Sequence, residues 1–226
     1  MPPADKPWTV LRLLDWTKEF FARKDVDSPR LAAEMLLAHV LDCPRIQLYA
    51  RHDHVPTDEQ RERFRELVRR AADHEPVAYL VGMKEFYSVP LRVCPDVLVP
   101  RPETEILVAE AINHLRTLDQ PGRVWDIGTG SGCVALAIAH QVPDARVLAS
   151  DVSEPAVAVA CDNAERLGLA DRVRIRRADL TALPEDCTDL APFDVLVSNP
   201  PYVADAEPVA RCVEYEPAVA LRGGPC

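Results

Sequence analysis

At residues 123–132 the chain reads Arg-Val-Trp-Asp-Ile-Gly-Thr-Gly-Ser-Gly, and small apolar residues follow from Cys133 to Gln141. The first part predicts a buried strand that runs into a glycine-rich loop, and the second part predicts a helix. A strand, a glycine loop and a helix in this order are typical of nucleotide-binding α/β folds. Gly128 and Gly130 would let the backbone approach a ligand closely. The stretch therefore predicts a ligand site at the carboxyl end of a strand.

The spacing of these glycines differs from that of a dinucleotide-binding loop. A dinucleotide fingerprint is G-x-G-x-x-G, whereas this loop is D-x-G-x-G-x-G, with Asp126 just before the first glycine. A carboxylate at this position would repel a pyrophosphate, but it can hold a cationic amino group directly or through water. The predicted ligand contacts of this loop are Asp126, Ile127, Gly128, Thr129 and Gly130.

Two further predicted strands end in acidic residues. Ala145 to Ser150 leads to Asp151, and Val173 to Arg176 leads to Asp179 and Leu180. A carboxylate after the second strand can accept both hydroxyls of a ribose, as in other doubly wound folds. Asp179 and Leu180 are placed to border an adenine ring. Each acid alone is more often a helix cap or a solvated loop residue, but their shared position after successive strands indicates S-adenosylmethionine as the ligand.

A fourth strand is predicted at Phe193 to Ser198, and Asn199-Pro200-Pro201-Tyr202 ends it. Both prolines stop a strand, because each lacks an N–H and has a fixed φ. The Asn199 side chain and the Pro200 carbonyl suit a planar, uncharged –NH2 group, whose flat face the Tyr202 ring can cover. A plain strand-ending turn is the alternative, because Asn-Pro is common turn chemistry. We also predict that Asn199 contacts the cofactor. The predicted catalytic residues are Asn199, Pro200 and Tyr202, and the predicted substrate contacts are Asn199, Pro200, Pro201 and Tyr202.

These blocks resemble the class I methyltransferases that carry an Asn-Pro-Pro-Tyr motif and methylate planar amino or amide nitrogens. Within that class, the chain is most similar to the release-factor glutamine methyltransferase family. The resemblance rests on Val97 to Glu105, Asp126 to Gly132 and Asn199 to Tyr202, with a softer block at Pro76 to Gly82 and Glu85-Phe86. The Arg-Pro-Glu-Thr-Glu run at residues 101–105 discriminates best, because similar enzymes that act on a ribosomal-protein glutamine usually lack it.

The resemblance implies transfer of a methyl group from S-adenosylmethionine to the side-chain amide nitrogen (N5) of a glutamine. That glutamine lies in the Gly-Gly-Gln motif of peptide chain release factors, which are then the protein substrates. We expect a cytoplasmic monomer that holds no metal and binds neither a membrane nor, directly, a nucleic acid. Two alternatives stay open: an adenine-N6 methyltransferase that acts on a flipped base in DNA or RNA, and an inactive truncated fragment.

The expected fold is an α/β, Rossmann-like class I methyltransferase sheet preceded by a small helical domain. We expect a helical substrate-recognition domain at residues 1–80, a β-hairpin linker at 81–102 and the methyltransferase domain at 103–226. One helical face is expected at Trp8, Leu11, Leu14 and Phe21, and another at Leu31, Met35 and Leu36. Strands are expected at Phe86-Tyr87, Leu91 to Val93 and Val97 to Val99, and a helix from Glu103 to Leu118.

Only four strands are predicted in the methyltransferase domain. Enzymes of the resembled family usually continue past Asn-Pro-Pro-Tyr into another helix and three more strands. The sheet is therefore expected to be C-terminally incomplete, with four of seven strands and the strand at 193–198 as an uncovered edge. A truncated reading frame or a fragment is the expected explanation; a natural minimal enzyme is the alternative, and it would leave a large apolar face exposed.

The charge and cysteine content of the chain argue against several other classes of protein. The 226 residues carry a net charge of −10; residues 1–75 hold 13 basic and 14 acidic side chains, and the remainder 13 and 22. This balance lacks the basic footprint of a protein that grips a phosphate backbone. Met1 to Lys6 carries no apolar signal segment, and the seven cysteines form no C-x-x-C pair, which predicts reduced thiols rather than disulfides or a zinc site. His52 and His54 are expected to be exposed loop residues.

Overall fold

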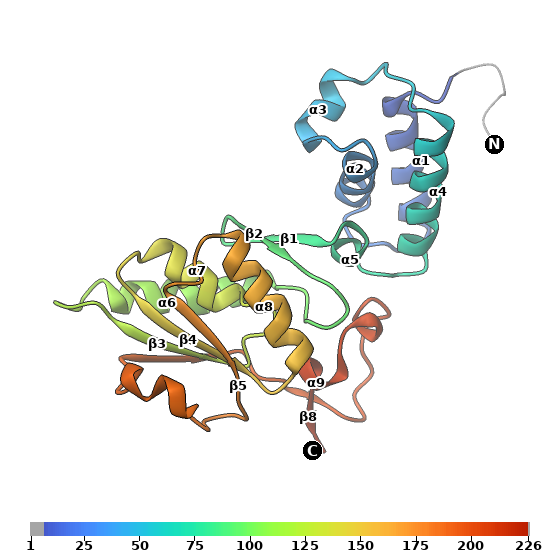
Figure 1. Ribbon diagram of the computed structural model, residues 1–226. Helices are drawn as coiled ribbons and strands as arrows, with labels where there is room; N and C mark the ends of the chain where they lie inside the picture. Colours follow the sequence, from blue (N-terminus) through green and yellow to red (C-terminus); the bar gives the residue numbers. More distant parts are fainter. Residues whose placement is uncertain (1–6, 226) are drawn as a thin grey trace. The chain divides into compact units, whose positions relative to one another are not determined.

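The computed structural model describes residues 7–225 and divides the chain into two compact units, Met1–Val81 and Gly82–Cys226 (Figure 1). The first unit is helical, and the described strands all belong to the second. Each unit has its own buried hydrophobic core. The expectations for Met1 to Lys6 and for the thiol of Cys226 concern residues outside the described range.

The helical unit has five helices within its described residues. They are α1 (Val10–Arg23), α2 (Pro29–Val40), α3 (Arg45–Ala50), α4 (Asp58–Ala72) and α5 (Val77–Val81). Helix α2 packs against both α1 and α4 (Figure 1). The capping box expected at the start of α4 is confirmed, because the Thr57 and Gln60 side chains each accept the other residue's backbone N–H.

The buried faces of two helices differ from the prediction. In α1 the buried side chains are Val10, Leu13, Thr17 and Phe21, whereas the expected Leu11 is 49% exposed. In α2 the expected Leu31 is 40% exposed. The buried residues of α1 follow helical spacing, so its buried face is rotated by about one residue from the predicted one.

The second unit begins with an antiparallel hairpin and continues as alternating helices and strands. The hairpin is β1 (Met83–Phe86) and β2 (Val89–Arg92). A 3₁₀ turn η1 (Pro102–Thr104) then leads into α6 (Glu105–Leu115), β3 (Arg123–Ile127), α7 (Cys133–Gln141), β4 (Arg146–Asp151), α8 (Glu154–Arg166), β5 (Val173–Arg177), η2 (Glu185–Leu190) and β6 (Val195–Ser198). The last described elements are β7 (Val203–Ala204), η3 (Val213–Tyr215), α9 (Ala218–Leu221) and β8 (Arg222–Gly224).

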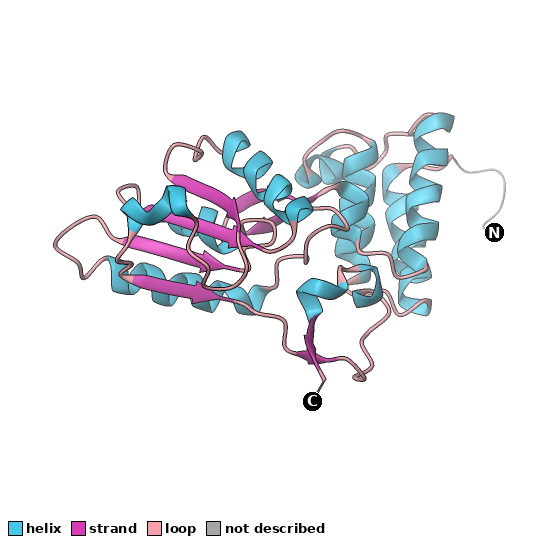
Figure 2. Ribbon diagram, turned by 60° about the horizontal axis from the view of Figure 1, so that its bottom comes forward, coloured by secondary structure: helices cyan, strands magenta, loops and turns pink. Residues whose placement is uncertain are grey.

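Strands β3 to β6 form one parallel sheet with the order β5-β4-β3-β6 (Figure 2). The expected α/β fold with four strands is therefore confirmed. Side chains alternate between the two faces of the sheet: Val124 packs in the core with α6, α7 and α8, and the next residue, Trp125, packs with η2. The two central strands, β3 and β4, are buried on both faces, which explains their mostly apolar sequences.

Strand β6 lies at an edge of this sheet and pairs with β3. Its Val197 is 8% exposed on the helix-covered face, while Leu196, on the other face, is 60% exposed. The Asn-Pro-Pro-Tyr turn therefore follows the edge strand directly. After the turn, β7 and β8 form a short parallel pair that the sequence analysis did not predict.

Two predicted elements are wrong in extent. Val97 to Val99 forms no strand, because the Val97 N–H donates to the carbonyl of Cys94 and the Val99 N–H donates to the side chain of Glu216. The helix predicted from Glu103 to Leu118 is shorter, since Pro102–Thr104 is a 3₁₀ turn and α6 ends at Leu115. The segment at 97–99 instead contributes to the wall of a cavity.

The described residues include no helix that is long and apolar enough to cross a membrane. Between residues 7 and 225, no cluster of three or more His, Cys, Asp or Glu side chains is suited to a metal ion. His52 and His54 are exposed, as expected.

Candidate active site

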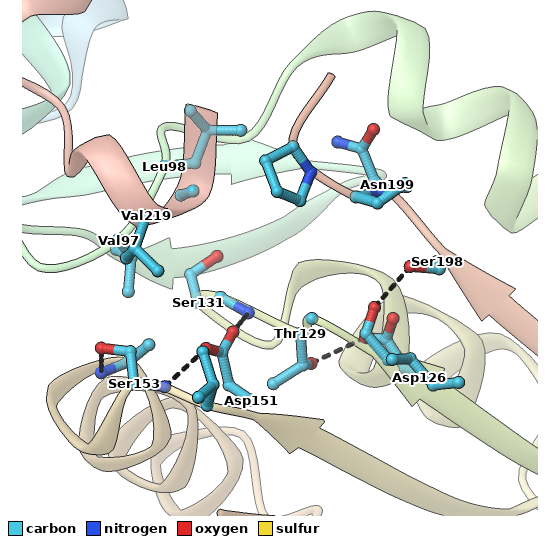
Figure 3. A pocket seen from close by; sticks show the side chains of 18 of the residues that line it. Val97, Leu98, Asp126, Thr129, Ser131, Asp151, Ser153, Ser198, Asn199 and Val219 are labelled. Atoms are coloured by element: carbon cyan, nitrogen blue, oxygen red, sulfur yellow. Dashed lines mark hydrogen bonds between the residues drawn. The ribbon is translucent and has the colours of Figure 1, made fainter. Parts of the chain in front are cut away.

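The carboxyl ends of β3, β4, β5 and β6 surround a cavity of about 330 Å³ (Figure 3). Ligand sites of open α/β sheets lie at this end of the strands. Most residues predicted for the site line it: Asp126, Ile127, Gly128, Thr129, Gly130, Asp151, Asp179, Leu180, Asn199, Pro200 and Pro201. The structure therefore brings together four loops that are far apart in the sequence.

The glycine loop leaves open space for a ligand. Gly128 and Gly130 have φ values of +74° and +56°, which favour glycine, and a Cβ on either would meet no atom within 4 Å. A side chain at either position would therefore be strained by the backbone and would project into unfilled space.

Asp151 connects the second strand to the glycine loop. Its Oδ2 accepts the Gly130 N–H at 2.9 Å, and its Oδ1 accepts the Ser153 N–H at 2.9 Å (Figure 3). Each carboxylate oxygen has two lone pairs, so both oxygens keep capacity for one more donor. The same carboxylate can thus fix the loop and accept hydrogen bonds from a ligand.

Asp126 is the buried acid of the cavity, with 1% of its surface exposed. Its Oδ2 accepts the Thr129 hydroxyl at 2.7 Å and the Ala135 N–H at 3.2 Å. Burial is the main reason that the pKa of Asp126 is raised to about 6, and the nearby negative charge of Asp151 acts in the same direction. A cation beside Asp126 would relieve both effects.

Asn163, on α8, holds the last part of the glycine loop in place. Its Nδ2 donates to the carbonyls of Ser131 and Arg92 at 2.9 and 3.0 Å, and its Oδ1 accepts the Arg92 N–H at 2.7 Å. The Ser131 hydroxyl is buried and makes no hydrogen bond of good geometry within the described residues, although it lies near the weakly bonding thiol of Cys133.

Asp179 and Leu180 lie at the outer part of the cavity. Both are exposed, and 70% of the Leu180 surface is accessible. An apolar side chain that is this exposed in a cavity wall offers area that a flat ligand can cover.

The Asn-Pro-Pro-Tyr turn separates the first cavity from a second one. Asn199 and Pro200 line both, whereas Tyr202 lines only the second and is 80% exposed. The second cavity, of about 510 Å³, is otherwise mostly apolar, with walls from α6, from the segment after β7 and from α9. The polar side chains of its lining, apart from Asn199 and Tyr202, are Arg101, Glu103 and Thr104.

Two further residues support this region, and the sequence analysis assigned them no role. The Asn199 Nδ2 donates to the Thr104 Oγ1 at 3.4 Å. The buried carboxylate of Glu216 accepts the Val99 N–H at 3.1 Å and pairs with the Arg101 guanidinium. Thr104 lies within the Arg-Pro-Glu-Thr-Glu run, which was a usable signal, whereas nothing in the local sequence distinguishes Glu216 from a surface acid.

Comparison with known proteins identifies two family domains in the chain. Residues 12–82 match the PrmC N-terminal domain, and residues 104–215 match the methyltransferase small domain. Among solved structures, a human methyltransferase 10 domain containing protein aligns over 52% of this chain and 56% of its own, with a TM-score of 0.42 and 21% identity.

Curated relatives match over almost the whole chain. A release factor glutamine methyltransferase from Rhodopirellula baltica is 52% identical over 98% of this chain and 76% of its own length. The enzymes of the same name from Chlorobaculum tepidum and Escherichia coli are 43% and 39% identical, over 97% and 91% of this chain and 77% and 73% of their own. The chain therefore belongs to the release factor glutamine methyltransferase family.

Proposed function

We propose that this protein transfers a methyl group from S-adenosylmethionine to the side-chain amide nitrogen (N5) of a glutamine in the Gly-Gly-Gln motif of peptide chain release factors. The observation that carries the proposal is the position of Asn199, at the junction of two adjoining cavities. One cavity suits the methyl donor and the other suits a segment of protein substrate, and the polar turn between them suits the acceptor amide.

The residues of the first cavity fit the proposed cofactor. Its volume of about 330 Å³ is within the range of small-molecule sites. Asp126 would hold the cationic amino group, the remaining lone pairs of Asp151 would accept the ribose hydroxyls, and Leu180, with Asp179, would border the adenine. The open space at Gly128 and Gly130 would admit the methionine moiety. When bound, S-adenosylmethionine supplies an electrophilic methyl group on a sulfonium.

Methylation of the acceptor amide calls for residues that orient its nitrogen rather than for a strong base that deprotonates it. An amide nitrogen is a poor nucleophile, because its lone pair is delocalised into the carbonyl. No His or Lys lines either cavity within the described residues. We infer that the Asn199 Oδ1 and the Pro200 carbonyl accept the two amide hydrogens, direct the nitrogen lone pair at the methyl carbon and stabilise the positive charge that develops on nitrogen. Tyr202 would cover the amide plane, and the methylated nitrogen would release its extra proton to solvent.

Charge also favours a basic protein segment as substrate. Residues 76–226 hold 13 basic and 22 acidic side chains, so their field attracts positively charged partners. The arginines of the cavity walls are already engaged: Arg101 pairs with Glu216, and Arg222 donates to the carbonyls of Ala204 and Glu207. No observation favours a nucleic acid as the substrate.

We further propose that the helical unit holds the body of the release factor. We also propose that the protein acts as a monomer in the cytoplasm, the compartment in which translation terminates. Deleting residues 1–80 should then raise KM for an intact release factor while leaving the turnover of a short glutamine peptide nearly unchanged. If KM for the intact release factor were the same with and without the deletion, the helical unit would not contribute to substrate binding.

A direct test is a methyl-transfer assay with radiolabelled S-adenosylmethionine and three acceptors side by side: a release factor, a ribosomal protein and DNA. We expect label in the release factor and none in a release factor whose Gly-Gly-Gln glutamine is replaced by alanine. Label in the ribosomal protein or the DNA alone would refute the proposal. The Asn199→Ala variant controls for contaminating activity.

A further inference from the structure

Thr104 occupies the position where the two cavities meet. It ends the 3₁₀ turn η1, is 6% exposed and lines both cavities. Its Oγ1 accepts the Nδ2 donor of Asn199 at 3.4 Å, although the two residues are 95 positions apart in the sequence. This is the one hydrogen bond that the Asn199 side chain makes with the described residues.

The backbone that carries Thr104 is itself held in place. The Thr104 N–H donates to the carbonyl of Arg101 at 3.1 Å. The Arg101 side chain pairs with Glu216, whose side chain is 1% exposed and also accepts the Val99 N–H. The buried carboxylate of Glu216 thus fixes Val99 and Arg101, in the stretch that leads into the turn, which gives the Thr104 hydroxyl a defined position.

The orientation of the Asn199 amide decides whether it can bind a substrate amide. An asparagine side chain has an acceptor end and a donor end, and a rotation of its amide plane exchanges them. If Nδ2 faced the substrate –NH2 group, two donors would meet. With Nδ2 directed at Thr104, the Oδ1 remains as the acceptor for the substrate, as the proposed mechanism requires.

We propose that Thr104 is a positioning residue for methyl transfer, which fixes Asn199 in the orientation that presents Oδ1 to the acceptor amide. This inference rests on the proposed function. This role explains why the polar side chain of Thr104 is buried between two cavities. An apolar side chain of the same shape, such as valine, would avoid the cost of desolvating a hydroxyl group. The role is distinct from that of Asn199, because Thr104 acts through Asn199.

The first test compares two variants of the full chain in steady-state methylation of a release factor. Thr104→Val keeps the shape and removes the hydroxyl, so kcat should fall about 3- to 10-fold, the rate equivalent of one hydrogen bond, with KM for S-adenosylmethionine unchanged. Thr104→Ser keeps the hydroxyl and should recover most of the lost kcat. Thr117→Val, an exposed control just after α6, should match the parent. A parental kcat in Thr104→Val, or equal losses in the valine and serine variants, would overturn the inference.

The second test is a double-mutant cycle with Asn199→Ala. If Thr104 acts through Asn199, Thr104→Val has no further effect on kcat in the Asn199→Ala background. An equal loss in both backgrounds would mean that Thr104 supports the fold and not Asn199.

A third readout does not depend on activity, so it separates failure of this inference from failure of the proposed function. The side-chain amide of Asn199, assigned by comparison with Asn199→Ala, should have a high ¹⁵N order parameter in the parent and in Thr104→Ser, and a lower one in Thr104→Val. An unchanged order parameter in Thr104→Val would overturn the inference. A parent that methylates no release factor would refute the proposed function, and this measurement would still decide the role of Thr104.

Discussion

The carboxylate of Glu216 accepts the backbone N–H of Val99 at 3.1 Å, across 117 residues of sequence. The same carboxylate pairs with Arg101, so that one buried acid holds both ends of a short segment. The stretch around that segment and the residues after Glu216 together form one side of the first cavity, where Figure 3 shows Val97, Leu98 and Val219. Glu216 therefore joins two distant stretches of the chain that together form this side of the site.

Replacing Glu216 should loosen this side of the cavity. Glu216→Ala leaves the Val99 N–H without its acceptor, and we expect a loss of about 1–3 kcal/mol in the free energy of unfolding. The amide hydrogen of Val99 should exchange faster with solvent, which hydrogen exchange measures locally. Glu214→Ala, at an exposed neighbouring position, is the matched control. Unchanged exchange at Val99 in Glu216→Ala would show that the bond does not hold the segment.

Two buried serines near the glycine loop should respond differently to replacement by alanine. Ser131 and Ser150 are each 1% exposed, but Ser150 accepts the Trp125 Nε1–H at 2.8 Å, whereas the Ser131 hydroxyl lacks a good partner. Ser150→Ala should cost about 1–3 kcal/mol, because it leaves a buried N–H unsatisfied. Ser131→Ala should leave stability unchanged or raise it. Urea unfolding of the cofactor-free protein measures both, and an equal loss in the two variants would contradict the assignment.

The sequence predicted those parts of the site that depend on local chemistry. β3 and β6 are short apolar runs, and Gly128 and Pro200 mark where they end. The residues after these two strands could therefore be placed at one edge of the sheet. Their meeting in one cavity follows from the parallel arrangement, which the sequence pattern also indicates.

Contacts between distant segments could not be predicted in the same way. Two such contacts are the hydrogen bonds Asn199–Thr104 and Val99–Glu216. Both depend on the course of the chain around β6, which the pattern of apolar and polar residues does not determine. The strand expected at Val97 to Val99 failed for this reason: Val97 and Leu98 line the cavity, and the Val99 N–H donates to Glu216 instead of to a neighbouring strand. In α1, the packing of α2 decided that Leu13 and not Leu11 is buried.

The raised pKa of Asp126 predicts how cofactor affinity depends on pH. A bound ammonium group stabilises the ionised carboxylate, so the pKa in the complex lies below the value of about 6 in the free protein. Between these two values, binding must release a proton from Asp126. The Kd should therefore be constant above about pH 6 and should rise as the pH falls, by up to about tenfold per unit.

Calorimetry between pH 5 and pH 7 measures this dependence in a range where the amino group of the ligand stays protonated. Asp126→Asn should bind more weakly at neutral pH and should lose the dependence on pH. If Kd rose equally in the parent and in Asp126→Asn, another group would be responsible for the titration.

Asp151 should contribute to cofactor binding in two ways, because it fixes Gly130 and offers its remaining lone pairs to the ribose. Asp151→Ala should weaken S-adenosylmethionine binding by about 1–3 kcal/mol, the scale of charge-assisted hydrogen bonds. Asp151→Asn keeps one acceptor oxygen and should lose less. Asp162→Ala, which removes a partly exposed acid on α8, controls for the change of net charge. An unchanged Kd in Asp151→Ala would exclude the carboxylate from the cofactor site.

Asn199 should act mainly on the chemical step. Asn199→Ala removes one preorganised acceptor for the substrate amide, and we expect kcat to fall by about 10²–10³. Cofactor affinity should fall less, because the interaction is strongest in the transition state. Asn199→Asp is the sharper comparison: it keeps an acceptor oxygen, but it adds a charge and removes the Nδ2 donor that Thr104 accepts. Single-turnover methylation with a saturating release factor isolates this step from substrate binding. A rate near that of the parent in Asn199→Ala would contradict the mechanism, and equal rates in Asn199→Asp and the parent would show that the orientation of the amide does not limit the reaction.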